Sequence, residues 1–302
     1  MALLAVAMMA GACGSSSSKS KASGTVASQL VMGGPPECAT RSTCLAGLEQ
    51  IYGLHFKDFK PLDAGGPLTK TALKNGDIQV ARLFTSDEAI SIDNFVVLND
   101  DKHFQLAGNI VPVIRTAKAT SDVKSVLNKV SKALTTADLM NLNKSLDIDK
   151  QEPVDVAAKY VKDKGLAGSA TGGSKGSITI GSANFSENEM LADVYADALK
   201  GAGYSVSVKA KLGSREVVEP ALESGQIDLV PEYAGNYLSF LDTTVGALAL
   251  DQTVSKLQAL AATKGLAVLD ASPASDADAI AVAKATADKY HLSKISDLGK
   301  SA

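Results

Sequence analysis

The sequence predicts an α/β protein made of two similar lobes, and three observations support this fold class. Residues 72–84 read ALKNGDIQVARLF, and the same pattern of helix, glycine turn and buried strand recurs 149 residues later as ALESGQIDLVPEY, at residues 221–233. Strand-like and helix-like stretches alternate along the chain, which favours mostly parallel sheets flanked by helices on both faces. A Gly/Ser-rich linker at residues 167–177 separates the two halves.

Hydrophobic periodicity gives the expected elements in order. In the first half we expect strands at residues 28–32, 78–83, 95–98 and 110–114, and helices at 45–52, 66–74, 120–146 (with a break near Thr136 and Asp138) and 154–164. In the second half we expect strands at 178–180, 206–210, 227–230, 268–269 and 280–282, and helices at 187–202, 215–224, 253–264 and 286–290. Ser186 is expected to cap the helix that follows it, with Glu189 at the capping-box position.

Composition narrows the function classes. A chain of 302 residues can bury two ordinary cores. The net charge of −3, with Lys and Arg dispersed, argues against nucleic-acid binding. No apolar run is long enough to predict a transmembrane helix. The three histidines are scattered, and no Ser-His-Asp grouping, Walker loop or Rossmann fingerprint occurs, so we expect no metal, no cofactor and no enzyme activity.

The N-terminal segment predicts export. Residues 1–12 are apolar and end in small residues before Cys13, and a Ser-rich stretch follows, so residues 1–27 are interpreted as a signal segment and a flexible tether. Residues 10–13 resemble a bacterial lipobox, which favours a lipidated Cys13 and an anchor on the outer face of the cell membrane. The alternative is an ordinary secretory signal with a free cysteine.

Two further cysteines, Cys38 and Cys44, enclose five residues. In an exported protein this arrangement favours a local disulfide, which would fix the shape of the loop around Arg41. The spacing is too short for a metal site without histidine support.

An aromatic residue follows a buried strand in each half. Phe84 and Tyr233 occupy equivalent positions in the repeat, and open α/β sheets bind ligands at the carboxyl ends of their strands. Two facing lobes would therefore form a cleft with one aromatic on each wall. The alternative interpretation is that both are core residues.

Several segments resemble the substrate-binding proteins of ABC importers for osmoprotectants, the glycine betaine, choline and carnitine family. The strongest match is LGSREVVEPALESGQIDLVPEYAGN at residues 212–236. IGSANFSE at 180–187, GGPPECATR at 33–41 and FTSD at 84–87 also resemble segments of that family. In the family, the part similar to residues 178–302 comes first, so this chain resembles a circularly permuted member whose old ends are joined by the linker.

The resemblance implies a two-lobed fold of the type II periplasmic-binding-protein class, with two crossover strands between the lobes. We expect one lobe to span residues 28–108 with 283–302, a crossover strand and helices packing on the other lobe to span 109–166, and the second lobe with its crossover to span 178–282.

The resemblance also implies the chemistry of the cleft. A quaternary ammonium has no N–H donor and is held by aromatic faces, whereas a betaine carboxylate requires a fork-shaped cation. Tyr233 matches a cage tyrosine of the family, Phe84 falls where another cage residue is usual, and Arg41 matches the carboxylate anchor.

Other positions depart from the family pattern and make the expected pocket more polar. Asn236 replaces a threonine, Asp278 replaces a further aromatic, and Asn109 lies near the position of an expected tyrosine. Ala183 replaces a polar or basic residue, and Asn184 beside it completes the set of expected ligand-binding residues. These departures favour a ligand with hydroxyl or amide-like groups. Asp276 and Asp278 are also interpretable as turn residues.

These observations lead to a functional hypothesis. The expected protein is a monomeric solute-binding lipoprotein that captures a small osmoprotectant-like ligand and delivers it to the permease subunits of an ABC importer. The alternative is a sensor, or another binding protein of the same shape, for a more polar ligand that is not a quaternary ammonium.

Overall fold

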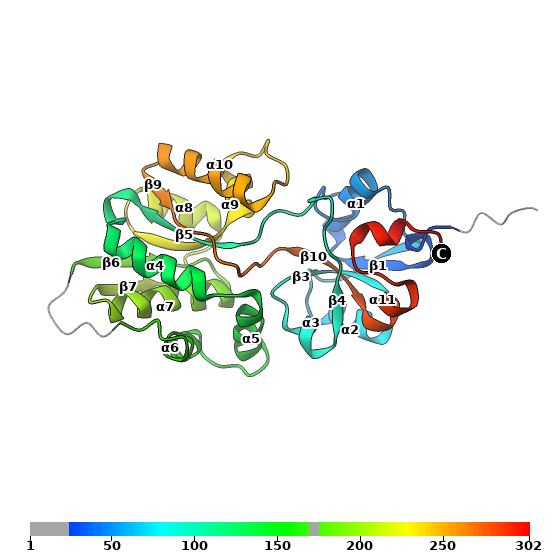
Figure 1. The fold of residues 1–302 in the computed structure, drawn as a ribbon, viewed down its shortest axis with the longest axis horizontal. Coiled ribbons are helices and arrows are strands. Elements are labelled where there is room, and N and C mark those ends of the chain that lie inside the picture. Colours follow the sequence, from blue (N-terminus) through cyan, green and yellow to red (C-terminus); the bar gives the residue numbers. More distant parts are fainter. Residues whose placement is uncertain (1–23, 169–174) are drawn as a thin grey trace, which may run out of the picture.

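The computed structural model describes residues 24–168 and 175–302, which form two α/β lobes side by side (Figure 1). The expected signal segment with Cys13, and residues 169–174 of the expected linker, lie outside the described residues. We call the two lobes A and B, where lobe A contains the first strands of the chain.

Lobe A is built on a five-stranded sheet with the order β2-β1-β3-β10-β4. Strand β1 pairs in parallel with β2 and β3, whereas β10 runs antiparallel to both β3 and β4. The strands are β1 (Val31–Gly34), β2 (Asp58–Pro61), β3 (Val80–Phe84), β4 (Phe95–Val97) and β10 (Asp278–Ala283).

Lobe B repeats this arrangement in a sheet with the order β7-β6-β8-β5-β9. Strand β6 pairs in parallel with β7 and β8, and β5 runs antiparallel to β8 and β9. The strands are β5 (Ile110–Arg115), β6 (Ser177–Gly181), β7 (Ser205–Lys209), β8 (Leu229–Tyr233) and β9 (Leu266–Val268).

The reversed strand of each sheet comes from the other half of the chain. Strand β5 follows the strands of lobe A but lies in the sheet of lobe B, and β10 follows the strands of lobe B but lies in the sheet of lobe A. Segments 98–109 and 269–277 therefore carry the chain between the lobes (Figure 1). The predicted two-lobed α/β fold is confirmed, and the residues expected as crossover strands are the single reversed strand of each sheet.

Helices cover both faces of the lobe A sheet. Buried residues of α1 and α11 pack with Met32 and Ile280 on one face, and buried residues of α2 and α3 pack with Leu83 and Ala281 on the other. These helices are α1 (Leu45–Tyr52), α2 (Pro67–Asn75), α3 (Glu88–Ile92) and α11 (Lys284–Tyr290). Short 3₁₀ turns span Ala27–Gln29, Pro36–Ala39 and Ile295–Gly299.

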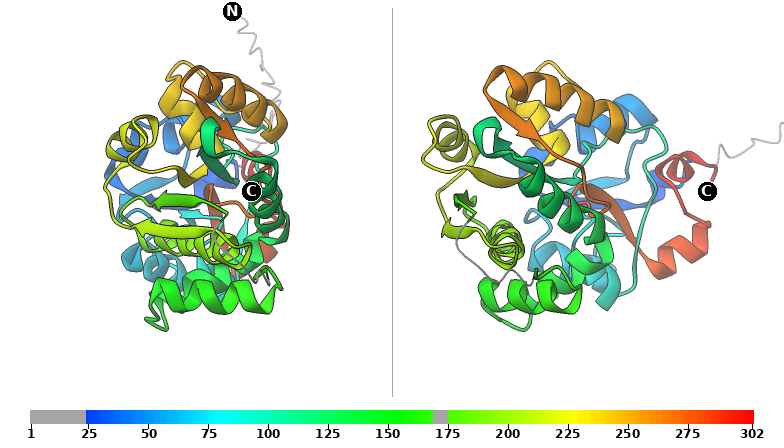
Figure 2. Two further views of the ribbon diagram at one scale, coloured as in Figure 1. Left: turned by 90° about the vertical axis from the view of Figure 1, so that its left-hand side faces the viewer. Right: turned by 60° about the vertical axis from the view of Figure 1, so that its left-hand side comes forward.

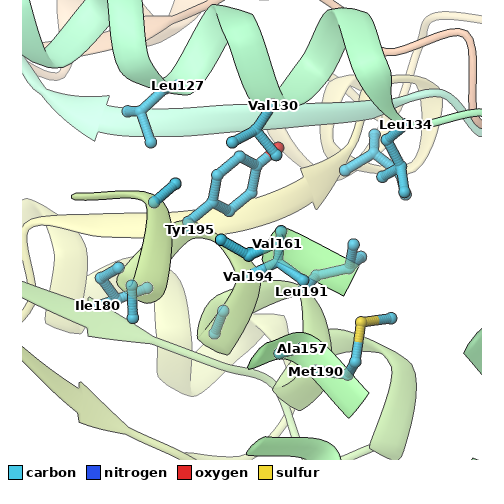
Figure 3. Packing of buried hydrophobic residues seen from close by; sticks show 14 of the residues in the cluster. Leu127, Val130, Leu134, Ala157, Val161, Ile180, Met190, Leu191, Val194 and Tyr195 are labelled. Atoms are coloured by element: carbon cyan, nitrogen blue, oxygen red, sulfur yellow. The ribbon is translucent and has the colours of Figure 1, made fainter. Parts of the chain in front are cut away.

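Helices also cover both faces of the lobe B sheet, and successive side chains of β5 point to opposite faces. Ile110 and Ile114 pack with helices α4 to α7, and Val111 and Val113 pack with α8 to α10 on the opposite face. Figure 2 shows helices on either side of this sheet. The helices are α4 (Ser121–Ala133), α5 (Thr136–Asp147), α6 (Pro153–Asp163), α7 (Ser186–Gly201), α8 (Arg215–Glu223), α9 (Ala234–Leu241) and α10 (Leu250–Thr263), with a 3₁₀ turn at Thr116–Lys118. Figure 3 shows Leu127 and Val130 of α4 above Tyr195 of α7.

Several local expectations differ from the structure. Strand β2 and helices α3 and α9 were not expected, and part of the strand expected at residues 28–32 is a 3₁₀ turn. Ser186 is not the cap of α7 but its first residue, and its hydroxyl donates to Asp147 Oδ1 at 3.3 Å. The break between α4 and α5 is made by Thr135, whose capping box with Asp138 satisfies backbone N–H groups at the start of α5.

The repeat seen in the sequence is also a repeat of packing. A Cβ atom on Gly33 of β1 would lie 2.5 Å from Ile78 Cδ1 and 3.1 Å from Leu62 Cδ1. A Cβ atom on Gly181 of β6 would lie 2.4 Å from Ile227 Cδ1 and 3.0 Å from Leu212 Cδ1. In both lobes, therefore, this strand position packs so closely against an isoleucine and a leucine that it requires glycine.

The two ends of the described chain meet in lobe A. Thr25 and Ser301 form an antiparallel bridge, Val26 N–H donates to Lys300 O at 2.9 Å, and Ala302 N–H donates to Gly24 O at 2.9 Å. Figure 1 shows the C-terminus beside β1 and α11. None of the helices in the described parts of the chain is both long enough and apolar enough to cross a membrane.

Candidate functional site

A cavity of about 970 Å³ lies between the lobes, at the carboxyl ends of β3 and β8. Lobe A lines it with the end of β3 and with residues of α2 and α3, and lobe B lines it with the end of α5 and the beginnings of α7, α8 and α9. Asp276 and Asp278, at the end of one connecting segment, also line it. We call this cavity the cleft.

Aromatic side chains reach the cleft from both lobes. Phe84 and Tyr233 line it, and so does Phe185, which sequence reasoning did not assign to the site. The rings of Phe185 and Tyr233 lie 6.0 Å apart between centroids and are tilted by 32°. Phe185 is 43% exposed, so its face is available to a ligand. The signal that could have identified it is an aromatic residue directly before a helix in the segment 180–187.

The two expected cage aromatics differ in their surroundings. Tyr233 is 5% exposed and belongs to the hydrophobic core of lobe B, so it is both a core residue and a cleft residue. Phe84 is half-buried, and the guanidinium carbon of Arg82 lies 4.0 Å from its ring centroid. One face of Phe84 is therefore already occupied by a cation of the protein itself.

Two carboxyl groups lie at the floor of the cleft. Glu187, at the start of α7, is 6% exposed; the Tyr233 hydroxyl donates to its Oε1 at 2.6 Å and Asn143 Nδ2 donates to its Oε2 at 2.6 Å. Asp276 accepts a hydrogen bond from the Ser86 hydroxyl of lobe A. Asn143 Nδ2 also lies 3.3 Å from the backbone oxygen of Ser86, which links α5 of lobe B to lobe A.

Burial disfavours the charged form of both acids. It raises the pKa of Glu187 well above the usual range, and the charge of Asp276 raises it further. Burial also raises the pKa of Asp276, against the opposing effects of the Ser86 hydrogen bond and the Arg82 charge. The pKa of the Tyr233 hydroxyl is likewise raised by burial and by the neighbouring Glu187, so Tyr233 remains a donor.

Most cations near the cleft already have partners, whereas the exposed Lys150 lines the cleft and forms no ion pair in the described parts of the chain. Arg82 forms an ion pair with Asp278, and burial together with the charge of Arg41 lowers the pKa of Arg82 to about 10. The guanidinium of Arg215 binds both carboxylate oxygens of Glu232, at 2.9 and 2.8 Å. Lys70 contacts Asp87 at 2.9 Å and Glu88 at 2.8 Å.

The structure does not bring Arg41 into the cleft, where the resemblance placed a carboxylate anchor. Its side chain is 57% exposed and lies 3.7 Å from Glu37 in an ion pair. Each arginine of the described chain is in such a pair, Arg115 with Asp228 included. None of them is thus left with its charge uncommitted for a ligand carboxylate.

The other expected residues are divided among three cavities. Asn236 is exposed and lines the cleft, and so does Asp278. Asn184 is exposed and lines a neighbouring cavity of about 430 Å³ together with Ala183. Asn109 lies beside another cavity and donates to Ser272 O at 2.9 Å, so its amide holds the two connecting segments together. Asp276 lies in a connecting segment and Asp278 is the first residue of β10, so neither lies in a turn, and both line the cleft.

Cys38 and Cys44 form a disulfide in lobe A, with their Cα atoms 5.1 Å apart. Both cysteines are buried in the core that contains Leu48 of α1. The bond therefore ties the loop that carries Arg41 to the beginning of α1. Across residues 24–168 and 175–302, no group of three or more His, Cys, Asp or Glu side chains is placed to hold a metal ion.

Two α/β lobes joined by two connecting segments, with a cleft at their strand ends, are the architecture of the periplasmic-binding-protein fold. Residues 19–163 and 176–302 match the substrate binding domain of ABC-type glycine betaine transport systems, and the chain belongs to this family.

Two bacterial binding proteins are similar to part of the chain. A glycine-betaine-binding protein of Pseudomonas aeruginosa is 32% identical over 146 residues, which cover 47% of this chain and 46% of the relative. The carnitine transport binding protein OpuCC of Listeria monocytogenes is 30% identical over 120 residues, 37% of each chain. These matches thus span about half the length of the relatives or less. Among solved structures, apo YehZ from Escherichia coli is 15% identical, with 88% of this chain and 84% of that chain covered and a TM-score of 0.40.

Proposed function

We propose that this protein captures a small osmoprotectant-like solute in the cleft and delivers it to the permease of an ABC importer. The observation that carries this proposal is the cleft itself, which aromatic side chains of both lobes line in a chain of this family. Aromatic faces attract a quaternary ammonium that has no hydrogen to donate. A ligand held by both lobes would favour the closed arrangement that a permease distinguishes from the open one.

The ligand class that we propose is the betaine, choline and carnitine class. The glycine betaine and carnitine named for the two relatives support this class. A second candidate is a more polar cation that is not a quaternary ammonium. This candidate is favoured by the floor of the cleft, where Glu187, Asp276 and Asn143 offer hydrogen-bond acceptors.

A thermal-shift screen followed by calorimetry tests the function. Choline, glycine betaine, carnitine, a polyol and an amino acid are added in turn to the purified protein. A true ligand at about 100 times its Kd should add about 2.7 kcal/mol of stability. Recovery of the ligand unchanged would show binding without turnover. A protein stabilised by none of these solutes would contradict the proposal, and loss of the ligand with time would indicate an enzyme.

The location that we propose is the outer face of the cell membrane, with the protein anchored as a monomer through a lipid on Cys13. The apolar residues 1–12 and the lipobox-like segment before Cys13 support this location. Replacement of Cys13 by alanine should release the protein from the membrane fraction. Unchanged membrane association of that variant would contradict the lipid anchor.

We also propose that the chain is a circular permutation of the family's order. The match to the family in two blocks and the hydrogen bonds between residues 24–26 and 300–302 support this interpretation. A gene that places residues 175–302 before residues 24–168 should yield a folded protein with the same ligand affinity. A variant of this order that fails to fold would contradict the proposal.

A further inference from the structure

Two acids, the buried Glu187 and the partly exposed Asp276, lie near each other at the lobe boundary, and neither forms an ion pair in the described parts of the chain. The groups that face them are the Tyr233 hydroxyl from β8, the Asn143 amide from α5, the Ser86 hydroxyl and Asp87 from the segment after β3, and Arg82 from β3. Ser86 lies near both acids, because it donates to Asp276 and also lowers the pKa of Glu187. Glu187 and Asp276 therefore form one cluster that spans both lobes.

The nearby positive charges do not neutralise this cluster. Arg82 lies close enough to act on Asp276, but its guanidinium is paired with Asp278 and stacked on Phe84. Lys70 is bound to Asp87 and Glu88. Two neighbouring carboxylates in a poorly hydrated site repel each other, so one of them retains a proton unless a cation arrives.

The same floor has an unused hydrogen-bond acceptor. Asn143 is 7% exposed and lines the cleft, and its Oδ1 has no hydrogen-bond partner in the structure, although its Nδ2 is bonded. A buried acceptor without a partner is costly. Because this oxygen has almost no accessible surface, a ligand O–H or N–H would satisfy it once the Asn143 side chain turns toward the cleft. The carboxyls and this amide oxygen together favour a ligand that carries a positive charge and a donor group.

We propose that Glu187 and Asp276 form the anionic subsite of the cleft, which receives a cation that lacks a carboxylate and releases their shared proton when the cation binds. The inference rests on the proposed function, since it assigns the ligand's charge to a part of the same cleft. The step involves no redox change: one carboxyl O–H bond ionises, the proton passes to solvent, and the cation replaces its charge.

The subsite distinguishes choline from glycine betaine. Choline carries one positive charge and a hydroxyl donor, which match the carboxyl pair and Asn143 Oδ1. Glycine betaine has the same quaternary ammonium but also a carboxylate, which would meet Glu187 and Asp276 with the nearby arginines already paired. The cleft should therefore bind choline more tightly than glycine betaine.

Isothermal titration calorimetry of the full chain with choline, in phosphate and in Tris buffer near pH 7, tests this inference. Because the two buffers differ in ionisation enthalpy, the difference in observed heat gives the number of protons released. We expect a release of up to one proton for each choline bound, and an affinity that rises with pH across the neutral range. We also expect glycine betaine to bind more weakly, by about tenfold or more, as for loss of a hydrogen bond to a charged group.

Two variants distinguish the loss of a subsite carboxyl from a general loss of one negative charge. Glu187→Gln keeps the shape and an acceptor for Tyr233 but leaves a single acid, so it should abolish proton release and weaken choline binding by about tenfold. Asp77→Asn removes the same charge from an exposed position before β3, outside the cleft, and should change neither quantity appreciably. Circular dichroism establishes that each variant is folded, and Asp276→Asn replaces Glu187→Gln if the latter is not.

The outcomes distinguish this inference from the proposed function. Choline binding without proton release, or glycine betaine bound more tightly than choline, would overturn the anionic subsite and leave the solute-binding function standing. Equal weakening by Glu187→Gln and Asp77→Asn would also overturn it, since a general charge effect would then suffice. If no osmoprotectant bound at all, the proposed function and the subsite would both fail.

Discussion

Lobes A and B share a backbone plan but line the cleft with different chemistry. In each lobe the strand that reaches the cleft ends on an aromatic residue that is paired with the reversed strand: Phe84 lies opposite Asp278 in lobe A, and Tyr233 lies opposite Ile110 in lobe B. Asp278 holds Arg82 against the ring of Phe84, whereas Tyr233 packs in the core and donates its hydroxyl to Glu187. The repeat therefore sets where the aromatics lie, and their neighbours set what each can do.

The first prediction is that the two aromatics contribute unequally to the free energy of unfolding. Tyr233→Ala should lower the free energy of unfolding by about 3–5 kcal/mol, because it empties a core position and removes one of the hydrogen-bond donors to Glu187. Phe84→Ala should cost clearly less, since Phe84 is half-buried. Urea unfolding followed by circular dichroism measures both. Equal losses would show that the two lobes hold their aromatics in the same way.

The second prediction concerns a brace that lobe A has and lobe B lacks. Reduction of the Cys38–Cys44 disulfide should lower the free energy of unfolding by about 2 kcal/mol, the entropy expected for so short a loop. Urea unfolding with and without a reducing agent gives the difference, and Cys38→Ser with Cys44→Ser is the control that the agent should not affect. No change on reduction would show that the loop is held by packing alone.

The third prediction uses pH to test the acid of lobe B. Folding raises the pKa of Glu187, so its protonation stabilises the folded protein. This contribution to the free energy of unfolding should be complete below the ordinary glutamate pKa of 4.5 and should be lost as pH rises into the neutral range. The loss should be at least about 1.4 kcal/mol, the equivalent of one pKa unit. Glu187→Gln should remove this part of the pH dependence in urea titrations. Identical pH profiles for the two proteins would contradict a buried, protonated Glu187.

The fourth prediction concerns the equivalent glycines of the two lobes. Gly33→Ala and Gly181→Ala should each destabilise the protein by about 1 kcal/mol, because each new methyl group meets the flexible end of an isoleucine. Urea unfolding should show the two losses to be similar. A large loss at one glycine alone would mean that the lobes are less alike in packing than in sequence.

Features that depend on a local sequence pattern could be predicted, whereas features that depend on how the lobes pack could not. The repeat that places Phe84 and Tyr233, the alternation of strands and helices, and the spacing of Cys38 and Cys44 are all local signals, and the two-lobed fold follows from them. The burial of Tyr233 is not local, because it depends on helices that pack on lobe B.

The acid pair and the arginines show the same limit. Glu187 and Asp276 come from distant segments that only the folded lobes bring together. Arg41 matches a family position, but its side chain is exposed beside Glu37, and the arginine that lines the cleft is Arg215. Charge partners of this kind have no fixed spacing in a sequence.

Calorimetric titration of choline into Phe84→Ala and Phe185→Ala tests most directly the central claim that one ligand is held between the lobes. One aromatic belongs to lobe A and the other to lobe B, and both line the cleft. We predict that each substitution weakens choline binding by about 0.5–2 kcal/mol, the range of a cation–π contact, while both variants remain folded. An unchanged affinity in either variant would place the ligand on a single lobe and contradict the account.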